Sequence, residues 1–380
     1  MSEAPDETEV SAVPQAEFEK ISAIVTAEFP INESLLEHGI PTYYLGDAHE
    51  TKQPFLNVLK NLESMSLIPI LRKMDGRIVL RVIPKPLVKP SRIWINWVLF
   101  FATIATTFLT GYIISEKVLD QVVGGALFTV AIMAVLGTHE MGHKLTANKK
   151  GIDATPPYFI PGPPPVGGLL GIGTFGAVIM QKSLPPNKDS LFDIGANGPV
   201  VGFILAAITS IIGLPFSIYQ WMPKDTGGLP EPLLFRLIGG ILPPFGSIPP
   251  YPASAAPGDY SLFINLHPVA FAGWVGLLVT MLNLLPAAML DGGHVARALI
   301  GTRARLVLTG FSILILAVAG FIPMALFVLF LAFYKHPGPL DDVSKLSMSR
   351  KLFTVGLIVI FVLSSYLHIL VLYLLQLFGF

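Results

Sequence analysis

Two histidines and a glutamate stand close together in the middle of the sequence. Residues 139–143 read HEMGH, so His139 and His143 are four positions apart and Glu140 follows the first histidine. On a helix, positions i and i+4 lie on one face, and two imidazoles at that spacing can bind a single Zn²⁺. Glu140 then lies about 100° around the helix from His139. The pattern predicts a metal centre at which Glu140 acts as general base for hydrolysis.

A catalytic zinc ion takes a third protein ligand and leaves a fourth position for water. Residues 283–294 read NLLPAAMLDGGH and end a distant charge-free run, with Asp291 and His294 both available as ligands. Asp291 would complete a two-histidine, one-carboxylate centre, which favours it over His294. Asp291 could also be an ordinary loop residue in an Asp-Gly-Gly turn. We expect one Zn²⁺ per chain, bound by His139, His143 and Asp291.

The residues that precede HEMGH support a functional interpretation. Residues 121–138 carry no charge and are long enough to lie within a membrane span. A charged side chain at membrane depth costs about 3 kcal/mol on insertion scales, and such residues are functional by default. The alternative is an ion pair of Glu140 with Lys144 at a helix end, which explains neither histidine.

The composition is that of an integral membrane protein. Of 380 residues, 52% are hydrophobic and 13% are charged, against about 25% charged in soluble domains. Because 23 of the 50 charged residues precede Ile93, the remainder contains long apolar runs. The absence of cysteine excludes thiol catalysis, disulfides and thiolate metal sites. A net charge of zero and the lack of a basic stripe indicate no nucleic-acid partner. Residues 1–7 are acidic, so we expect no cleavable signal peptide.

The apolar runs predict a polytopic α-helical membrane protein of about six or seven spans. Residues 306–334 form either one kinked span or two short ones, because Gly320 to Pro323 interrupt them. The other expected spans are residues 93–115, 121–138, 197–221, 268–290 and 352–377.

The part of the chain before the first span has a different pattern. We expect residues 1–14 to be disordered, residues 15–90 to form a small soluble α/β domain, and residues 91–380 to be the membrane-embedded part. Asp75-Gly76 between two alternating apolar runs predicts a β-hairpin. A strand is expected near residues 41–45, with helices near residues 18–25 and 53–65.

One charge-free segment cannot be a membrane helix. Residues 154–181 contain many prolines and glycines, which remove donors and disfavour helix. This segment is expected to be a membrane-associated β-hairpin or a re-entrant segment, with a strand near Thr174–Met180. The proline-broken residues 237–258 are expected to form an apolar loop at the membrane surface.

Basic residues near the span ends predict the orientation. They cluster before the first span, after the second and after the fourth, which places all three clusters on one side. We therefore expect a multi-pass protein, in the cell membrane, with its N-terminal domain and both motifs at the cytoplasmic face.

HExxH on a membrane helix, followed at a distance by NxxPxxxLDGGH, resembles the site-2 protease family of intramembrane zinc metalloproteases. The resemblance includes Phe192–Pro199 and His267–Trp274 and covers roughly residues 120–300. It is strongest to the archaeal and plastid branch, whose members carry a soluble N-terminal domain.

This resemblance implies roles for individual residues. Asp291 would be the third zinc ligand, and Asn283 would position the substrate strand or steady the oxyanion. A hairpin that lines the substrate would contain Thr174, Phe175 and Gly176.

The predicted function is hydrolysis of peptide bonds in or near transmembrane helices of membrane-anchored proteins. The partners would be a membrane-spanning protein substrate and the lipid bilayer. One alternative is a secondary transporter, whose broken helices and intramembrane acidic residues would also fit, although the two halves show no inverted repeat. Another is an inactive membrane scaffold, against which the complete motifs argue.

Overall fold

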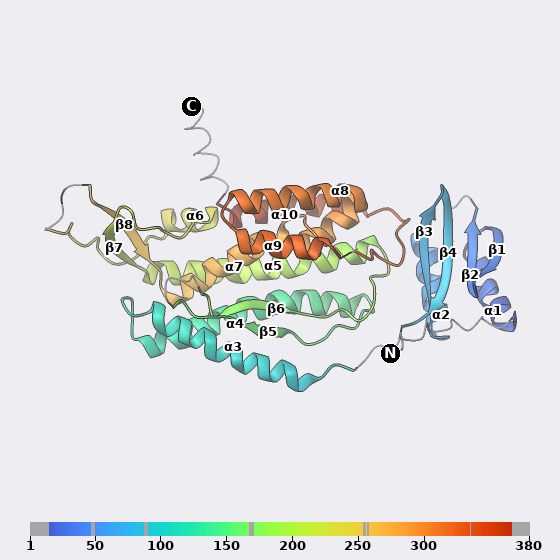
Figure 1. Cartoon of the computed structure of the whole chain (residues 1–380), viewed down its shortest axis with the longest axis horizontal. Coiled ribbons are helices and arrows are strands. Elements are labelled where there is room, and N and C mark those ends of the chain that lie inside the picture. The colour runs from blue at the N-terminus through green and yellow to red at the C-terminus, as the bar shows by residue number, and fades with distance from the viewer. Residues whose placement is uncertain are drawn as a thin grey trace, which may run out of the picture. The chain divides into compact units, whose positions relative to one another are not determined.

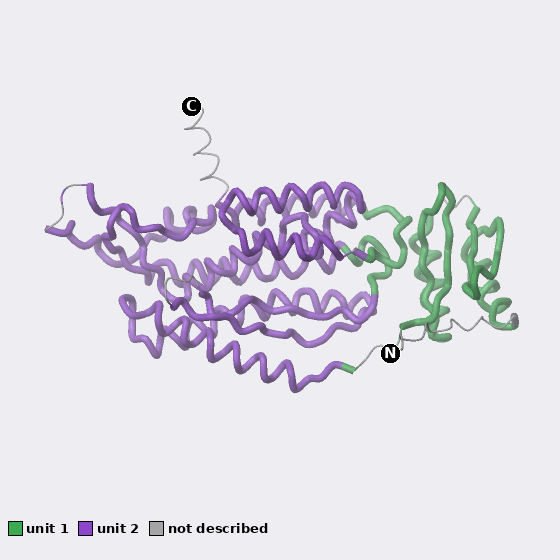
Figure 2. Tube along the Cα trace, in the orientation of Figure 1, with its two compact units in different colours: residues 1–90, 184–191, 337–347 green, residues 91–183, 192–336, 348–380 purple. Residues whose placement is uncertain are grey.

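The computed structural model divides the chain into two compact units, which Figure 2 shows in green and purple. Unit 1 contains Met1–Pro90, Leu184–Leu191 and Pro337–Ser347. Unit 2 contains Ser91–Ser183, Phe192–His336 and Met348–Phe380. The residues that the structure describes are 15–46, 50–86, 90–166, 171–253, 256, 258–334 and 336–366. The predicted disordered segment 1–14 lies outside them.

Unit 1 is built on an antiparallel four-stranded sheet of order β1-β2-β4-β3. The predicted hairpin is confirmed, because Asp75 and Gly76 both have positive φ, as a tight turn requires. The strand β1 was not predicted from the sequence. Its side chains are mostly exposed, so it lacks an alternating apolar pattern. In chain order the elements are α1 (Gln15–Thr26), β1 (Ile31–Glu37), β2 (Ile40–Leu45), α2 (Lys52–Glu63), β3 (Leu67–Met74) and β4 (Arg77–Pro84).

Two segments from far along the chain extend this sheet beyond β3. Leu71 pairs in parallel with Asp341, which pairs in parallel with Asn187. The Leu71 N–H donates to Leu340 O at 2.9 Å, and the Asp341 N–H donates to Pro186 O at 2.9 Å. Asp341 is fully buried. Unit 1 therefore includes two linkers from between the later helices.

Unit 2 is mainly helical, as expected for a polytopic membrane protein. Within the described residues, four helices are long and apolar enough to cross a membrane: Ile93–Ile114, Gln121–Lys149, Lys188–Phe216 and Asp291–Val318. The helices are α3 (Ile93–Ile114), α4 (Gln121–Lys149), α5 (Lys188–Gly213), α6 (Leu233–Ile241), α7 (Pro268–Leu284), α8 (Asp291–Val318), α9 (Ile322–Ala332) and α10 (Met348–Ser364) (Figure 1).

Several helix bounds differ from the predicted spans. α5 ends at Gly213 rather than near residue 221, because a 3-10 turn containing Pro215 follows it and leads into a strand. α7 ends at Leu284, so Asp291 begins the next helix instead of ending this one. The break around Gly320 separates α8 from α9, which resolves residues 306–334 into parts of two helices. α8 is itself broken at Gly301, whose φ is 81° and ψ is −172°.

The core of unit 2 lies around α4. Phe128, Ile132 and Val135 of this helix share a buried apolar cluster with Ala206 of α5 and Trp274 of α7. α3 packs on the other side of α4 through glycine contacts that allow close approach of the backbones. Figure 1 shows α4 beside α3 and the strands β5 and β6. The helix that carries HEMGH is therefore buried on the sides that these neighbours contact, while side chains such as Val130 are exposed.

The proline- and glycine-rich segment forms strands, as predicted. β5 (Tyr158–Pro161) pairs antiparallel with β6 (Thr174–Val178). Within the described residues, no helix passes through Pro161–Pro165. A second antiparallel pair of strands, β7 (Ile218–Pro223) with β8 (Tyr260–Asn265), was not predicted. The apolar loop was expected at residues 237–258, between these two strands. The short helix α6 covers the first part of that range and β8 follows it.

Candidate metal centre

α4 brings His139, Glu140 and His143 together on one buried side of the helix. Their exposed fractions are 3%, 7% and 6%, and their potential ligand atoms all lie within 4.8 Å of one another. The helix begins after Asp120, whose carboxylate accepts the N–H groups of two first-turn residues at 3.0 Å. The predicted clustering of these three side chains is therefore present.

Asp291, the first residue of α8, completes a triangle with the two histidines. Its Oδ2 lies 3.2 Å from His139 Nε2 and 3.3 Å from His143 Nε2. The two Nε2 atoms are 3.2 Å apart. A tetrahedral ion with ligands at about 2.0 Å has edges of about 3.3 Å between ligand atoms. The triangle therefore has the size of one face of such a tetrahedron, and the three residues fit a zinc ion.

A backbone carbonyl determines which nitrogen of His143 can bind a metal. His143 Nδ1 is 2.7 Å from Ile194 O, so Nδ1 carries the proton and donates it. Nε2 then presents its lone pair toward Asp291. Asp193, next to Ile194, pairs with Lys150 at 2.8 Å and with Arg350 at 2.7 Å. The Lys150 pair holds the start of α5 against the end of α4, and the Arg350 pair joins it to α10 (Met348–Ser364).

α5 contacts the cluster through glycines. A Cβ at Gly195 would lie 2.8 Å from Asp291 O, and one at Gly202 would lie 2.8 Å from His139 Nδ1. A Cβ at Gly198 would collide with the His143 ring. We call these three glycines the glycine face of α5. Phe192–Pro199, which contains two of these glycines, was quoted only for the family resemblance, although glycines at i, i+3 and i+7 were a usable signal.

Asn283 of α7 lies at the cluster. Its Nδ2 is 3.3 Å from His139 Nε2. The hairpin also reaches the site, because the backbone of Ile179, just after β6, is close enough to Glu140 to affect its electrostatics.

The three hairpin residues predicted to bind substrate differ in their surroundings. The Thr174 hydroxyl is buried, donates to Ile160 O at 2.8 Å and accepts from Gly176 N at 3.0 Å. Phe175 is 73% exposed. Gly176 has a φ of 103°, which suits glycine alone. Thr174 therefore shapes the strand, while Phe175 is free to contact another molecule.

His294, the alternative third ligand, has a different partner. Its Nδ1 lies 2.8 Å from Nε2 of His336, which follows α9. The triangle of ligand atoms contains Asp291 instead. His336 was missed by the sequence analysis, because no motif surrounds it and its partner is 42 positions away.

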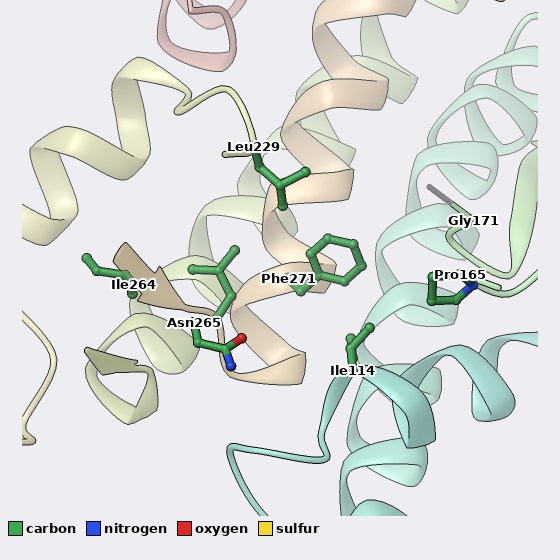
Figure 3. A pocket seen from close by; sticks show the side chains of 8 residues that line it. Ile114, Pro165, Gly171, Leu229, Ile264, Asn265 and Phe271 are labelled. Carbon is green, nitrogen blue, oxygen red and sulfur yellow. The ribbon is translucent and has the colours of Figure 1, made fainter. Parts of the chain in front are cut away.

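A separate pocket of about 240 Å³ lies elsewhere in unit 2. Figure 3 shows the Phe271 ring and Leu229 on one side, with Ile114 and Pro165 opposite. Asn265 is the polar side chain of its lining. The pocket shares no residue with the cluster, so the candidate chemistry is not located there.

The sequence model of peptidase family M50 matches residues 127–327, more than half of the chain. This range contains His139, Glu140, His143 and Asp291. The chain belongs to peptidase family M50. The resemblance to site-2 proteases is thereby confirmed.

Plant proteins are among the relatives of this chain. The probable zinc metalloprotease EGY2, chloroplastic, of Arabidopsis thaliana is 33% identical over 229 residues, which are 58% of this chain and 36% of the relative. EGY1 of the same plant is 31% identical over 246 residues, 63% of this chain and 42% of the relative. The chain thus spans about two fifths or less of the length of these relatives. No solved structure matches significantly.

Proposed function

We propose that this chain is an intramembrane zinc metalloprotease that hydrolyses peptide bonds in or near the transmembrane helices of membrane-anchored proteins. The observation that carries the proposal is the triangle of His139 Nε2, His143 Nε2 and Asp291 Oδ2, with edges of 3.2–3.3 Å. It is buried among apolar helices, which suits a substrate that also lies in the membrane. The names of the plant relatives agree with this activity.

His139, His143 and Asp291 would hold one Zn²⁺ per chain. Zinc at such a centre lowers the pKa of a water molecule to about 7 and polarises the substrate carbonyl. Glu140 would accept the proton from the attacking water and pass it to the leaving amine. Asn283, beside His139, would donate from its amide to the developing oxyanion or position the substrate strand.

The β5–β6 hairpin would hold the substrate in extended form. A transmembrane helix pairs all its backbone groups internally, so it must unwind before its peptide bonds can be attacked. An unwound segment can add to the edge of a strand through main-chain hydrogen bonds. β6 is suited to this role because Phe175 is exposed and the strand leads directly to Ile179 at Glu140.

The segments that make up unit 1 support a topology with about six or seven spans. Residues 184–191 and 337–347 share a sheet with β3, and one sheet cannot lie on both sides of a bilayer. The chain therefore crosses the membrane an even number of times between these segments. Helices α3 and α4 would supply the first two crossings, and the long helices α5 and α8 two of the next four. The shorter apolar helices α7 and α9 would supply the other two together with the residues that flank them. The basic clusters near the span ends support a cytoplasmic position for unit 1. We propose a location in the cell membrane and membership of the archaeal or plastid-like branch.

The substitution Glu140→Gln tests the proposal. Glutamine keeps the shape of the side chain but cannot accept the proton, so cleavage of a transmembrane substrate should fall about 10²–10⁴-fold. Elemental analysis should find about one zinc per chain in both forms, because Glu140 is a base and not a ligand. Glu116→Gln, at an exposed position, is the matched control and should cleave normally.

Two outcomes on the same gel would contradict the proposal. Undiminished cleavage by Glu140→Gln would show that the base is misassigned. Zinc-loaded wild-type protein that cleaves none of several helical substrates would favour the transporter or the scaffold. A chelator-treated sample should lose activity if zinc is required.

A further inference from the structure

A short loop joins two residues of the metal centre. α7 ends at Leu284 and α8 begins at Asp291, so residues 285–290 connect Asn283 to Asp291. Most of this loop is buried. The loop also touches the start of α8, since a Cβ at Gly293 would collide with Ala288 O. A shift of the loop would therefore move both Asn283 and Asp291.

Ala288, in the middle of the loop, has a strained backbone that is held from both sides. Its φ is 44°, in the left-handed region that crowds the Cβ of any residue other than glycine. Its N–H donates to Thr309 Oγ1 at 3.0 Å, and its carbonyl accepts from Arg305 Nη1 at 2.6 Å. Such a conformation persists only where the surrounding groups hold it.

Arg305 is a buried cation without a matching carboxylate. Its exposed fraction is 3%, and within the described part of the chain no ion pair is found for it. Its side chain binds the Ala288 carbonyl. The break at Gly301 separates Arg305 from Asp291, so the two belong to different halves of α8. A buried charge in an apolar helix is costly and is retained by default for function.

We propose that Arg305 and Thr309 are positioning residues of the metal centre. They hold both polar groups of Ala288 and thereby set the places of Asn283 and Asp291. Thr309 lies one helical turn after Arg305 and also donates to Arg305 O at 2.9 Å, so the two side chains act from one face. The inference deepens the proposed function and rests on it, because it assumes that the cluster binds zinc.

The test is zinc affinity, measured on purified full-length protein against a chromophoric chelator. Arg305→Met keeps the apolar stem of the side chain but removes the donor. Loss of such supporting contacts typically lowers metal affinity 10–100-fold, and we expect a loss of that size. Arg303→Met is the matched control, since Arg303 is exposed on the same helix, and its affinity should not change.

Further variants separate positioning from folding. Thr309→Val should weaken zinc binding in the same direction, and Arg305→Lys should recover part of the affinity because it restores one donor. Hydrogen exchange of residues 285–293 should become faster in Arg305→Met, while exchange in α4 stays unchanged. Excess zinc should restore cleavage by a folded Arg305→Met protein.

The outcomes distinguish this inference from the proposed function. A wild-type protein that binds no zinc would overturn the proposed function. The hydrogen exchange of residues 285–293 would still test whether Arg305 and Thr309 hold the loop. The inference would be overturned if Arg305→Met or Thr309→Val bound zinc as tightly as the wild-type protein and showed unchanged hydrogen exchange of residues 285–293. An equal loss of affinity in Arg303→Met would also overturn it, by showing a general effect of charge.

Discussion

The contact between Gly202 and His139 tests whether the glycine face positions the metal ligands. A Cβ at Gly202 would lie 2.8 Å from His139 Nδ1, whereas ordinary van der Waals contact begins at 3.4 Å. In Gly202→Ala, the imidazole or α5 must therefore move by about 0.6 Å (3.4 − 2.8). Metal–ligand distances tolerate about ±0.2 Å. We expect zinc affinity to fall about 10–100-fold and cleavage to fall about 10²-fold.

The assay combines zinc titration against a chelator with cleavage on a gel. Gly356→Ala on α10 is the matched control, because no atom lies within 4 Å of its added Cβ. Both substitutions increase helix propensity by about 1 kcal/mol, so the control should melt at a higher temperature with unchanged zinc affinity. Gly198→Ala should lose more than Gly202→Ala, because its Cβ would collide with the His143 ring. Wild-type zinc affinity and cleavage in Gly202→Ala would refute the reasoning.

Three other predictions concern separate parts of the molecule. Asp291→Ala should reduce zinc content in elemental analysis, while His294→Ala should leave it nearly unchanged; the reverse result would exchange their roles. Thr174→Val removes the hydroxyl that hydrogen-bonds to Ile160 of β5 and to Gly176 of β6. Substrate cleavage should therefore fall while zinc content stays unchanged. The Tyr44 hydroxyl, with help from a nearby arginine, holds the pKa of Glu37 below its ordinary value. Because this pKa is lowered on folding, its contribution to stability is lost as pH falls through the folded value. Tyr44→Phe should therefore raise the pKa of Glu37 measured by NMR; an unchanged pKa would contradict this.

Elements with strong periodicity could be predicted from the sequence. The apolar runs of α3 and α4 and the Asp75-Gly76 turn were predicted because each depends on neighbouring residues. β1 has no alternating pattern since it is an exposed edge strand. The added segment around Asp341 is only a few residues long and pairs with Leu71. Short segments whose partners lie far away in the sequence leave no local pattern, so they could not be found.

The residues of the candidate site also divide into those with a local sequence pattern and those without one. HEMGH was recognisable because a helix converts its spacing into one face, and Asp291 because it belongs to a motif. The contacts of His336 with His294 and of Arg305 with Ala288 were missed, since these partners lie 42 and 17 positions away. Their contacts depend on how α8 is broken at Gly301 and how the loop before it turns. Neither feature follows from composition or periodicity.

The sheet of unit 1 has a consequence for the order of synthesis. Leu71 and its partner Asp341 are 270 positions apart (341 − 71). At about 5–20 residues per second, a ribosome needs roughly 15–55 s to make the chain between them. During this interval the outer edge of β3 lacks its neighbour and could pair with other chains. The first sheet to be made is thus the last to be finished, and a ribosome that stalls before Pro337 would leave a nascent chain prone to aggregation through β3.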